Sequence, residues 1–439
     1  MRSPNEREKV LQLVLSTPAL YSLELTPLCN NKCPGCFNVF IDDKVKRPME
    51  HIRSSLTAAE WRTILEKIQP HAERVKLTGG EPTLHPEFEQ IVRTLGELNI
   101  SFSIFTNARW RKPDQLIGYL KTFPQFVGML ISLHGADATT HEAYSGICGS
   151  FDETVTNIRR AVVAGLNVAT STVIHKHNFD QIPPIVEFSN TLGANLAVIN
   201  RYLGKPLPQI ETSAAELKMA VQVVEQLHHQ GARVKFGTCV PQCFVGNSST
   251  GCLAGAAYCA ISPWGELRPC NHSSTVAGNL LKQSIDETWH SAEMETWRGL
   301  MPNECEIECT AFAKCHGACR ALIEIRGQHR DPLRNVPIRI TSNKKNAERV
   351  KFYEGLHPLA NFHLRQEEFG YVAMRGNRVV PITMLDHAIL QTCDGTRTLR
   401  RIQDDFGPNG LRTIAVLYKK GLVEFAEDTT MEEKTKVRD

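Results

Sequence analysis

The regular alternation of short apolar runs with amphipathic stretches, between Tyr21 and about Gly231, constrains the fold of this chain more than any other feature. Each short run predicts a strand and each amphipathic stretch predicts a helix. Six such units in succession predict an α/β fold, with a parallel sheet or an incomplete barrel and helices outside it. The predicted strands begin at Tyr21, Arg74, Ser101, Gly128, Asn167 and Leu196.

Two capping boxes are predicted to start helices, "TAAE" at Thr57 and "SFDE" at Ser150. The first precedes apolar residues at helical spacing, namely Trp61, Ile64, Leu65 and Ile68. In parallel α/β folds, ligands bind at the carboxyl ends of the strands. Candidate site residues are therefore sought directly after each predicted strand.

The chain has 14 cysteines, and its N-terminus lacks the long apolar core of a signal peptide. Without secretion, clustered thiols more often bind metal than form disulfides. Cys148 and Cys393 stand apart, and we expect them to be small buried apolar residues. The other cysteines form three groups: Cys29, Cys33 and Cys36; Cys239, Cys243, Cys252, Cys259 and Cys270; and Cys305, Cys309, Cys315 and Cys319.

The first group is a CxxxCxxC motif, "CNNKCPGC", directly after the first predicted strand. Three thiolates can hold three irons of a [4Fe–4S] cluster and leave the fourth iron open to another ligand. A structural zinc site would be expected to close with four ligands. A zinc or storage site that adds a histidine from elsewhere is the alternative.

These residues resemble the signature of the radical S-adenosylmethionine (SAM) enzymes, in which an aromatic residue, here Phe37, follows the last cysteine. A second family element, "LTGGEPTLHP", follows the second strand, while "FTNA" and "ISLHG" match the ends of the third and fourth strands. Ala108 replaces a frequent glycine of the family. The resemblance implies that the cysteines hold the cluster and that SAM is contacted by Phe37, Gly79, Gly80, Glu81, Pro82, Asn107 and Ser132.

The resemblance also implies a reaction. An electron from an external donor, such as a flavodoxin or ferredoxin, cleaves bound SAM to methionine and a 5′-deoxyadenosyl radical, which abstracts a hydrogen atom from an unreactive C–H bond. The protein would aim the radical and exclude water.

The second and third cysteine groups resemble the SPASM extension of radical enzymes, which binds two auxiliary [4Fe–4S] clusters. That resemblance implies one cluster on Cys252, Cys259, Cys270 and Cys319, and a second on Cys305, Cys309 and Cys315. Three residues separate Cys305 from Cys309, where two are usual, and no cysteine follows Cys319 before Cys393. The fourth ligand of the second cluster is therefore open: Cys239, Cys243, Asp331, His329 or the substrate. Structural zinc is the alternative for this region.

The sequence predicts a compact C-terminal unit. It begins with a hairpin that turns at Gly376 and Asn377, and three helical patterns and the short strand "LVEF" follow. It resembles the PqqD-like domains called RiPP recognition elements. These small winged-helix-like units bind the leader of a precursor peptide as an added strand beside their hairpin. Winged helices also bind nucleic acid, but the helix "LRTIAVLYKKG" has few basic residues.

The predicted organisation is a partial (β/α)6 radical SAM barrel, a cysteine-rich SPASM lobe and a small α+β winged-helix-like domain. The boundaries are an N-terminal segment at 1–16, the barrel at 17–235, the SPASM domain at 236–325, a linker at 326–358, the PqqD-like domain at 359–427 and a tail at 428–439. The formal charge of +3 is small for this length, so it gives no reason to expect a nucleic-acid partner. No apolar run approaches the length that a membrane-spanning helix needs. We expect a cytoplasmic protein.

Together these features predict a radical SAM enzyme that modifies a ribosomally made precursor peptide, by forming a cross-link or excising a backbone unit. One alternative is a SPASM enzyme that matures a folded protein, as sulfatase maturases do, or a small metabolite. Another is a non-catalytic, cluster-containing scaffold that binds peptides.

Overall fold

The computed structural model describes residues 14–42, 47–48, 54–244, 251–301, 303–334, 352–419 and 421–425. The chain divides into two compact units, residues 1–340 and residues 341–439. Each unit has its own apolar core.

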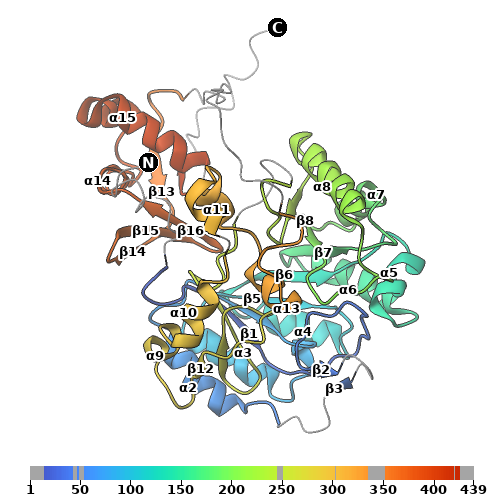
Figure 1. The fold of residues 1–439 in the computed structure, drawn as a ribbon. Helices are drawn as coiled ribbons and strands as arrows, with labels where there is room; N and C mark the ends of the chain where they lie inside the picture. The colour runs from blue at the N-terminus through green and yellow to red at the C-terminus, as the bar shows by residue number, and fades with distance from the viewer. Residues whose placement is uncertain are drawn as a thin grey trace. The chain divides into compact units, whose positions relative to one another are not determined.

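A ten-stranded sheet in the order β12-β11-β10-β1-β4-β5-β6-β7-β8-β9 organises the first unit (Figure 1). All six predicted strands are present and parallel, so the α/β prediction is confirmed. Their bounds are Leu20–Glu24 (β1), Arg74–Thr78 (β4), Phe102–Thr106 (β5), Phe126–Ser132 (β6), Val168–Ile174 (β7) and Leu196–Arg201 (β8). A two-stranded sheet pairs β2 (Ile41–Asp42) with β3 (Arg47–Pro48).

The cysteine-rich lobe continues this sheet. Strand β10 (Tyr258–Ile261) pairs in parallel with β1, and β11 (Glu266–Arg268) and β12 (Gly278–Asn279) follow antiparallel. At the other edge, β9 (Val234–Phe236) pairs in parallel with β8. The described residues of the lobe also form five short helices, α9 (Ile285–Trp289), α10 (Ala292–Arg298), α11 (Asn303–Glu308), α12 (Phe312–Cys315) and α13 (Arg320–Arg326).

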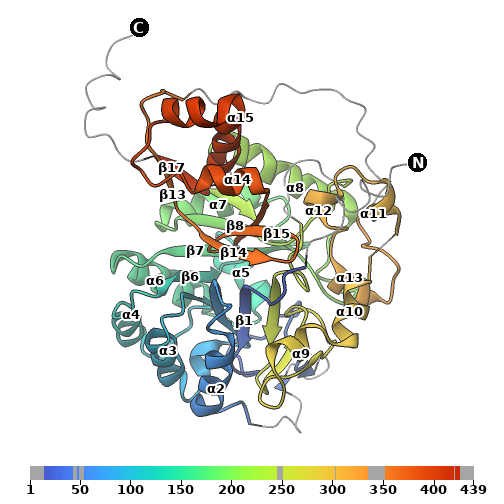
Figure 2. The same cartoon turned by 90° about the vertical axis from the view of Figure 1, so that its left-hand side faces the viewer.

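Helices follow the parallel strands, and Figure 2 shows α2, α3, α4 and α6 along one side of the sheet. Thr57 caps α2 through the predicted capping box. The second predicted box is wrong: Ser150 is the first residue of α6, after Gly149, and its buried hydroxyl contacts that of Ser145. The helices and the short 3-10 turn are α2 (Ala58–Ile68), η1 (Pro82–Leu84), α3 (Phe88–Glu97), α4 (Pro113–Leu120), α5 (Ala138–Ser145), α6 (Ser150–Val163), α7 (Ile182–Thr191) and α8 (Ala214–His229).

The two faces of the sheet differ in burial. On the outer face, alternate residues such as Leu23, Leu77 and Ile104 pack against the helices and are almost completely buried. The residues between them form the inner face of the partial barrel, and most of these are only half-buried. The strand registers place on the inner face Ser22, Glu24, Lys76, Ser103, Phe105, Leu130, Ser132, Ser171, Asn200 and Tyr258.

The second unit contains the predicted hairpin, with Arg375 paired to Arg378 across Gly376 and Asn377. Strands β14 (His363–Glu367), β15 (Gly370–Arg375) and β16 (Arg378–Ile382) form one antiparallel sheet, and β13 (Pro358–Ala360) pairs with β17 (Val423–Phe425). Helices α14 (Met384–Leu390) and α15 (Leu399–Lys419) cover its core. The backbone of Gly407 breaks α15 into the two helices that the sequence predicts.

No helix in the described ranges combines the length and the apolar character that crossing a membrane requires.

Candidate functional site

The loop that carries Cys29, Cys33 and Cys36 leaves the carboxyl end of β1. Burial, with smaller contributions from the charges of Glu81 and Cys36, raises the pKa of the Cys29 thiol to about 12, although hydrogen bonds with the Asn31 amide and Asn107 oppose the shift. Burial also raises the pKa of Cys33, followed by the charges of Cys36 and Cys29. The three thiols therefore share one electrostatic environment, in which a bound cation would favour their deprotonated forms.

Contacts with the following βα units hold this loop. The Tyr144 hydroxyl donates to the Gly35 carbonyl at 3.2 Å, and the Lys32 amide donates to the Ser145 carbonyl at 2.8 Å. A Cβ atom on Gly35 would lie 2.9 Å from the Tyr144 hydroxyl. The loop conformation thus depends on helix α5 as well as on its own sequence.

The two glycines of the GGEP motif let two backbones approach closely. The Gly80 amide donates to the Thr26 carbonyl at 2.6 Å, and the Glu81 amide donates to the Leu28 carbonyl at 2.7 Å. Gly79 has a φ of +141°, a region that favours glycine. The motif therefore fixes the backbone immediately before Cys29.

A Gly80→Ala substitution tests this role, because the new Cβ would lie 2.0 Å from the Leu28 carbonyl oxygen. We expect the free energy of unfolding to fall by about 1–3 kcal/mol and the iron content to drop. Gly118→Ala in helix α4, with nothing within 4 Å of the new Cβ, is the control and should not destabilise the protein. Urea unfolding and iron analysis measure both effects. Equal behaviour of the two variants would contradict this role of Gly80.

Glu81 is fully buried, and its side chain joins the ends of β4 and β5. Its carboxylate accepts from the Thr106 hydroxyl at 2.8 Å and from the Asn107 amide at 2.8 Å. Burial raises the pKa of Glu81, whereas these hydrogen bonds lower it. Pro82 is also buried and begins η1, so both residues lie within the packed strand ends.

Asn107, at the end of β5, reaches the cysteine loop. Its side-chain amide lies 3.7 Å from the Cys29 sulfur and donates to the Asn30 side chain at 2.6 Å. Ala108, which stands where the family frequently has glycine, has a φ of +60°. The left-handed conformation is thus kept without glycine, at a cost of about 1 kcal/mol.

Two further predicted residues, Ser132 and Phe37, have different surroundings. Ser132 ends β6 on the inner face and is half-buried. The Phe37 ring is 38% exposed and lies 4.9 Å from the ring of His272, two residues after Cys270. Phe37 thus contacts the cysteine-rich lobe.

A polar network that the sequence reasoning missed lies on the inner face, where the barrel meets the lobe. The Lys76 ammonium donates to the Tyr258 hydroxyl at 3.0 Å and to the Asn271 side chain at 3.2 Å. Burial lowers its pKa to about 8, against the opposing charges of Glu24 and Cys270. A lysine within the apolar run "RVKLT" is the signal that could have revealed it.

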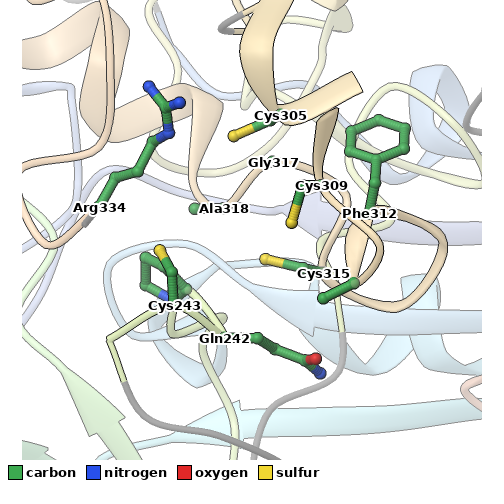
Figure 3. Close-up of a pocket in the computed structure, with 11 residues that line it drawn as sticks. Gln242, Cys243, Cys305, Cys309, Phe312, Cys315, Gly317, Ala318 and Arg334 are labelled. Atoms are coloured by element: carbon green, nitrogen blue, oxygen red, sulfur yellow. The ribbon is translucent and has the colours of Figure 1, made fainter. Parts of the chain in front are cut away.

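The thiols of the cysteine-rich lobe gather in two sets. Cys270 and Cys319 belong to one buried cluster with Trp297, and the half-buried Cys239 and Cys252 pack against it. The pKa of Cys239 is raised, first by a hydrogen bond with the Cys252 thiol, and that of Cys319 is raised first by one with Cys239. The other set lines a pocket and consists of Cys243, Cys305, Cys309 and Cys315 (Figure 3).

Cys259, which the sequence places with Cys252, Cys270 and Cys319, does not join them. It pairs with Tyr21 on β1 and packs in the core beneath the helices, on the outer face of the sheet. Burial alone raises its pKa, whereas neighbouring thiols also contribute at Cys239 and Cys270. The physical reason is the two-residue period of β10, which turns Cys259 away from the inner face.

Comparison with known proteins agrees with this arrangement. Residues 23–189 match the model of the Radical SAM superfamily, and residues 252–319 match the SPASM iron–sulfur cluster-binding domain. The AdoMet-dependent heme synthase of Methanosarcina barkeri is 24% identical over 333 residues, which cover 70% of this chain and 92% of that protein. The PqqA peptide cyclase of Methylobacterium nodulans is 24% identical over 322 residues, covering 70% and 82%.

Among solved structures, SuiB of Streptococcus suis bound to the precursor peptide SuiA superimposes with a TM-score of 0.59 at 17% identity, covering 75% of this chain and 77% of that one. This similarity supports the barrel fold. The chain thus contains a Radical SAM superfamily domain and a SPASM domain, and it is an enzyme that uses SAM and [4Fe–4S] clusters.

Proposed function

We propose that this enzyme modifies a ribosomally made precursor peptide by cross-linking an unactivated carbon or by excising a backbone unit. The observation that carries the proposal is the three-thiol loop at the carboxyl end of β1, in a chain that is similar to a PqqA peptide cyclase. When the cluster and SAM are bound, they supply the 5′-deoxyadenosyl radical. Cys29, Cys33 and Cys36 would hold that cluster, and the strand ends around Gly79, Asn107 and Ser132 would position SAM.

The inner face of the barrel is suited to hold the segment that reacts. Its half-buried positions combine hydroxyl groups, the ring of Phe105 and the ammonium of Lys76. Such a surface can orient a peptide backbone by hydrogen bonds while excluding bulk water. The reacting residue would lie between the three-thiol loop and the lobe.

We further propose that the C-terminal unit binds the leader segment of the peptide. Strands β14 and β16 stand at the two edges of its three-stranded sheet, where an extended segment can add as a further strand. Leu364 on β14 is 39% exposed, and Val379 on β16 is half-buried. An external electron donor, such as a flavodoxin or ferredoxin, would start the reaction.

Coexpression with the short peptide encoded beside its gene, followed by mass spectrometry, tests the modification. We expect a mass change in the peptide with the full chain. Charge at a sheet edge opposes strand addition, so Leu364→Glu combined with Val379→Glu should weaken peptide binding at least about tenfold, a loss of about 1.4 kcal/mol. Fluorescence anisotropy with a labelled peptide measures binding.

Met384→Glu is the matched control, because Met384 is 67% exposed on α14 and outside both edge strands. It should leave peptide binding unchanged, and neither variant should alter SAM cleavage without peptide. Unchanged binding in the edge variant would refute the leader-binding role.

A small metabolite or folded protein is the second candidate substrate, favoured by the similarity to a heme synthase. An unmodified peptide, together with SAM cleavage by the reduced enzyme, would support this alternative.

A further inference from the structure

The pocket of the lobe presents four thiols to one space. Cys305 lies on α11, Cys309 follows it, Cys315 ends α12, and Cys243 comes from the segment after β9 (Figure 3). Arg334 also lines this pocket. Cys243 therefore shares one space with the other three cysteines.

The two non-cysteine side chains that the sequence left open lie elsewhere. Both carboxylate oxygens of Asp331 accept from Arg201, and one also accepts from the Cys319 amide at 3.1 Å. This pair is almost completely buried, so freeing Asp331 to bind iron would leave the guanidinium buried without its partner. His329 is exposed and does not line the pocket.

A sharp turn explains how neighbouring cysteines reach different sets. In a continuous helix, Cys315 and Cys319 would lie one turn apart on the same face. Instead, His316, Gly317 and Ala318 have φ values of +55°, +77° and +77°. Left-handed backbone at non-glycine residues costs about 1–2 kcal/mol each, and here it directs Cys315 to the pocket and Cys319 to the buried set.

The segment after β9 also contributes one cysteine to each set. Cys239 lies with Cys252, Cys270 and Cys319, whereas Cys243 lines the pocket. Each set then contains four thiols, the number of protein ligands that a fully ligated [4Fe–4S] cluster takes.

We propose that Cys239 and Cys243 complete the two auxiliary [4Fe–4S] clusters, one cysteine each, and that Cys259 is not a ligand. Both clusters would then have four protein thiolates. Fully ligated clusters can exchange electrons but offer no iron to a substrate atom, so their role would be electron transfer. This inference holds whichever substrate the enzyme takes.

The test compares Cys243→Ala with Cys259→Ala, because the proposal makes Cys243 a cluster ligand whereas the sequence-based assignment makes Cys259 one. Both are made in a chain where Cys29, Cys33 and Cys36 are alanine, so that only auxiliary clusters remain. The parent should hold about eight irons after anaerobic reconstitution. Cys259→Ala should keep them, while Cys243→Ala should lose up to about half or show the electron paramagnetic resonance signal of a three-iron cluster. The opposite pattern would overturn the proposal.

Thiol alkylation of the unaltered protein gives a second measurement that does not depend on a variant folding. Iodoacetamide and peptide mass spectrometry follow Cys243 and the exposed Cys148 before and after iron is removed by a chelator. We expect Cys243 to be protected only in the iron-loaded protein and Cys148 to react in both. Equal alkylation of Cys243 with and without iron would exclude it as a ligand.

Discussion

Replacing Cys36 with alanine is expected to reduce the formation of 5′-deoxyadenosine from SAM by more than about a thousandfold. Cys36 is the most exposed thiol of the three-cysteine loop, and its charge raises the pKa of both Cys29 and Cys33. Two remaining thiolates cannot hold the cluster with a single open iron. Chromatography of the reduced reaction mixture measures the nucleoside.

Two control variants separate this site from the other cysteines. Cys148→Ala changes a cysteine outside the three groups, which is exposed and not buried as the sequence predicts, and should leave cleavage unchanged. Cys309→Ala alters the pocket set and should retain part of the cleavage, because it leaves the three-thiol loop intact. Full activity in Cys36→Ala, or equal losses in Cys36→Ala and Cys309→Ala, would contradict the assignment.

The pattern of apolar residues predicted the barrel strands because the side chains on the outer face of every strand are buried against helices. The capping box at Thr57 was also correct, since its hydrogen bonds are local. The box at Ser150 failed because the Ser150 hydroxyl contacts the Ser145 hydroxyl, which lies five residues earlier and outside the four-residue pattern. A four-residue pattern contains no information about such a neighbour.

Spacing found the three-thiol loop but did not predict which thiols of the lobe lie together. Cys259 has suitable spacing, yet the register of β10 with Tyr21 turns it into the outer core. Cys239 and Cys243 reach their sets through the path of the chain after β9, and Cys315 and Cys319 separate through backbone angles at His316 to Ala318. These features arise from tertiary structure and cannot be counted along the sequence.

The buried ion pair of Glu24 and Arg268 joins the barrel to the lobe. Glu24 ends β1, five residues before Cys29, and Arg268 ends β11, two residues before Cys270. Both side chains are at most 2% exposed, and Asn271 also donates to Glu24 at 2.9 Å. This pair therefore links the loop of the three-thiol site to the hairpin that carries Cys270.

Glu24→Gln is expected to lower the free energy of unfolding by about 3–5 kcal/mol, because Arg268 would remain charged and buried without its partner. Glu24→Leu combined with Arg268→Met should cost much less, since neither buried charge remains. Urea unfolding under anaerobic conditions, followed by circular dichroism, measures both midpoints and slopes.

Arg62→Ala provides the comparison for an exposed ion pair, because Arg62 and Glu97 are 41% and 48% exposed. That change should cost far less than Glu24→Gln, because water and salt screen an exposed ion pair. If the double variant were as unstable as Glu24→Gln, the loss would reflect packing and not the unpaired charge. If Glu24→Gln were as stable as Arg62→Ala, the link between barrel and lobe would rest on the apolar contacts around β1 and β10.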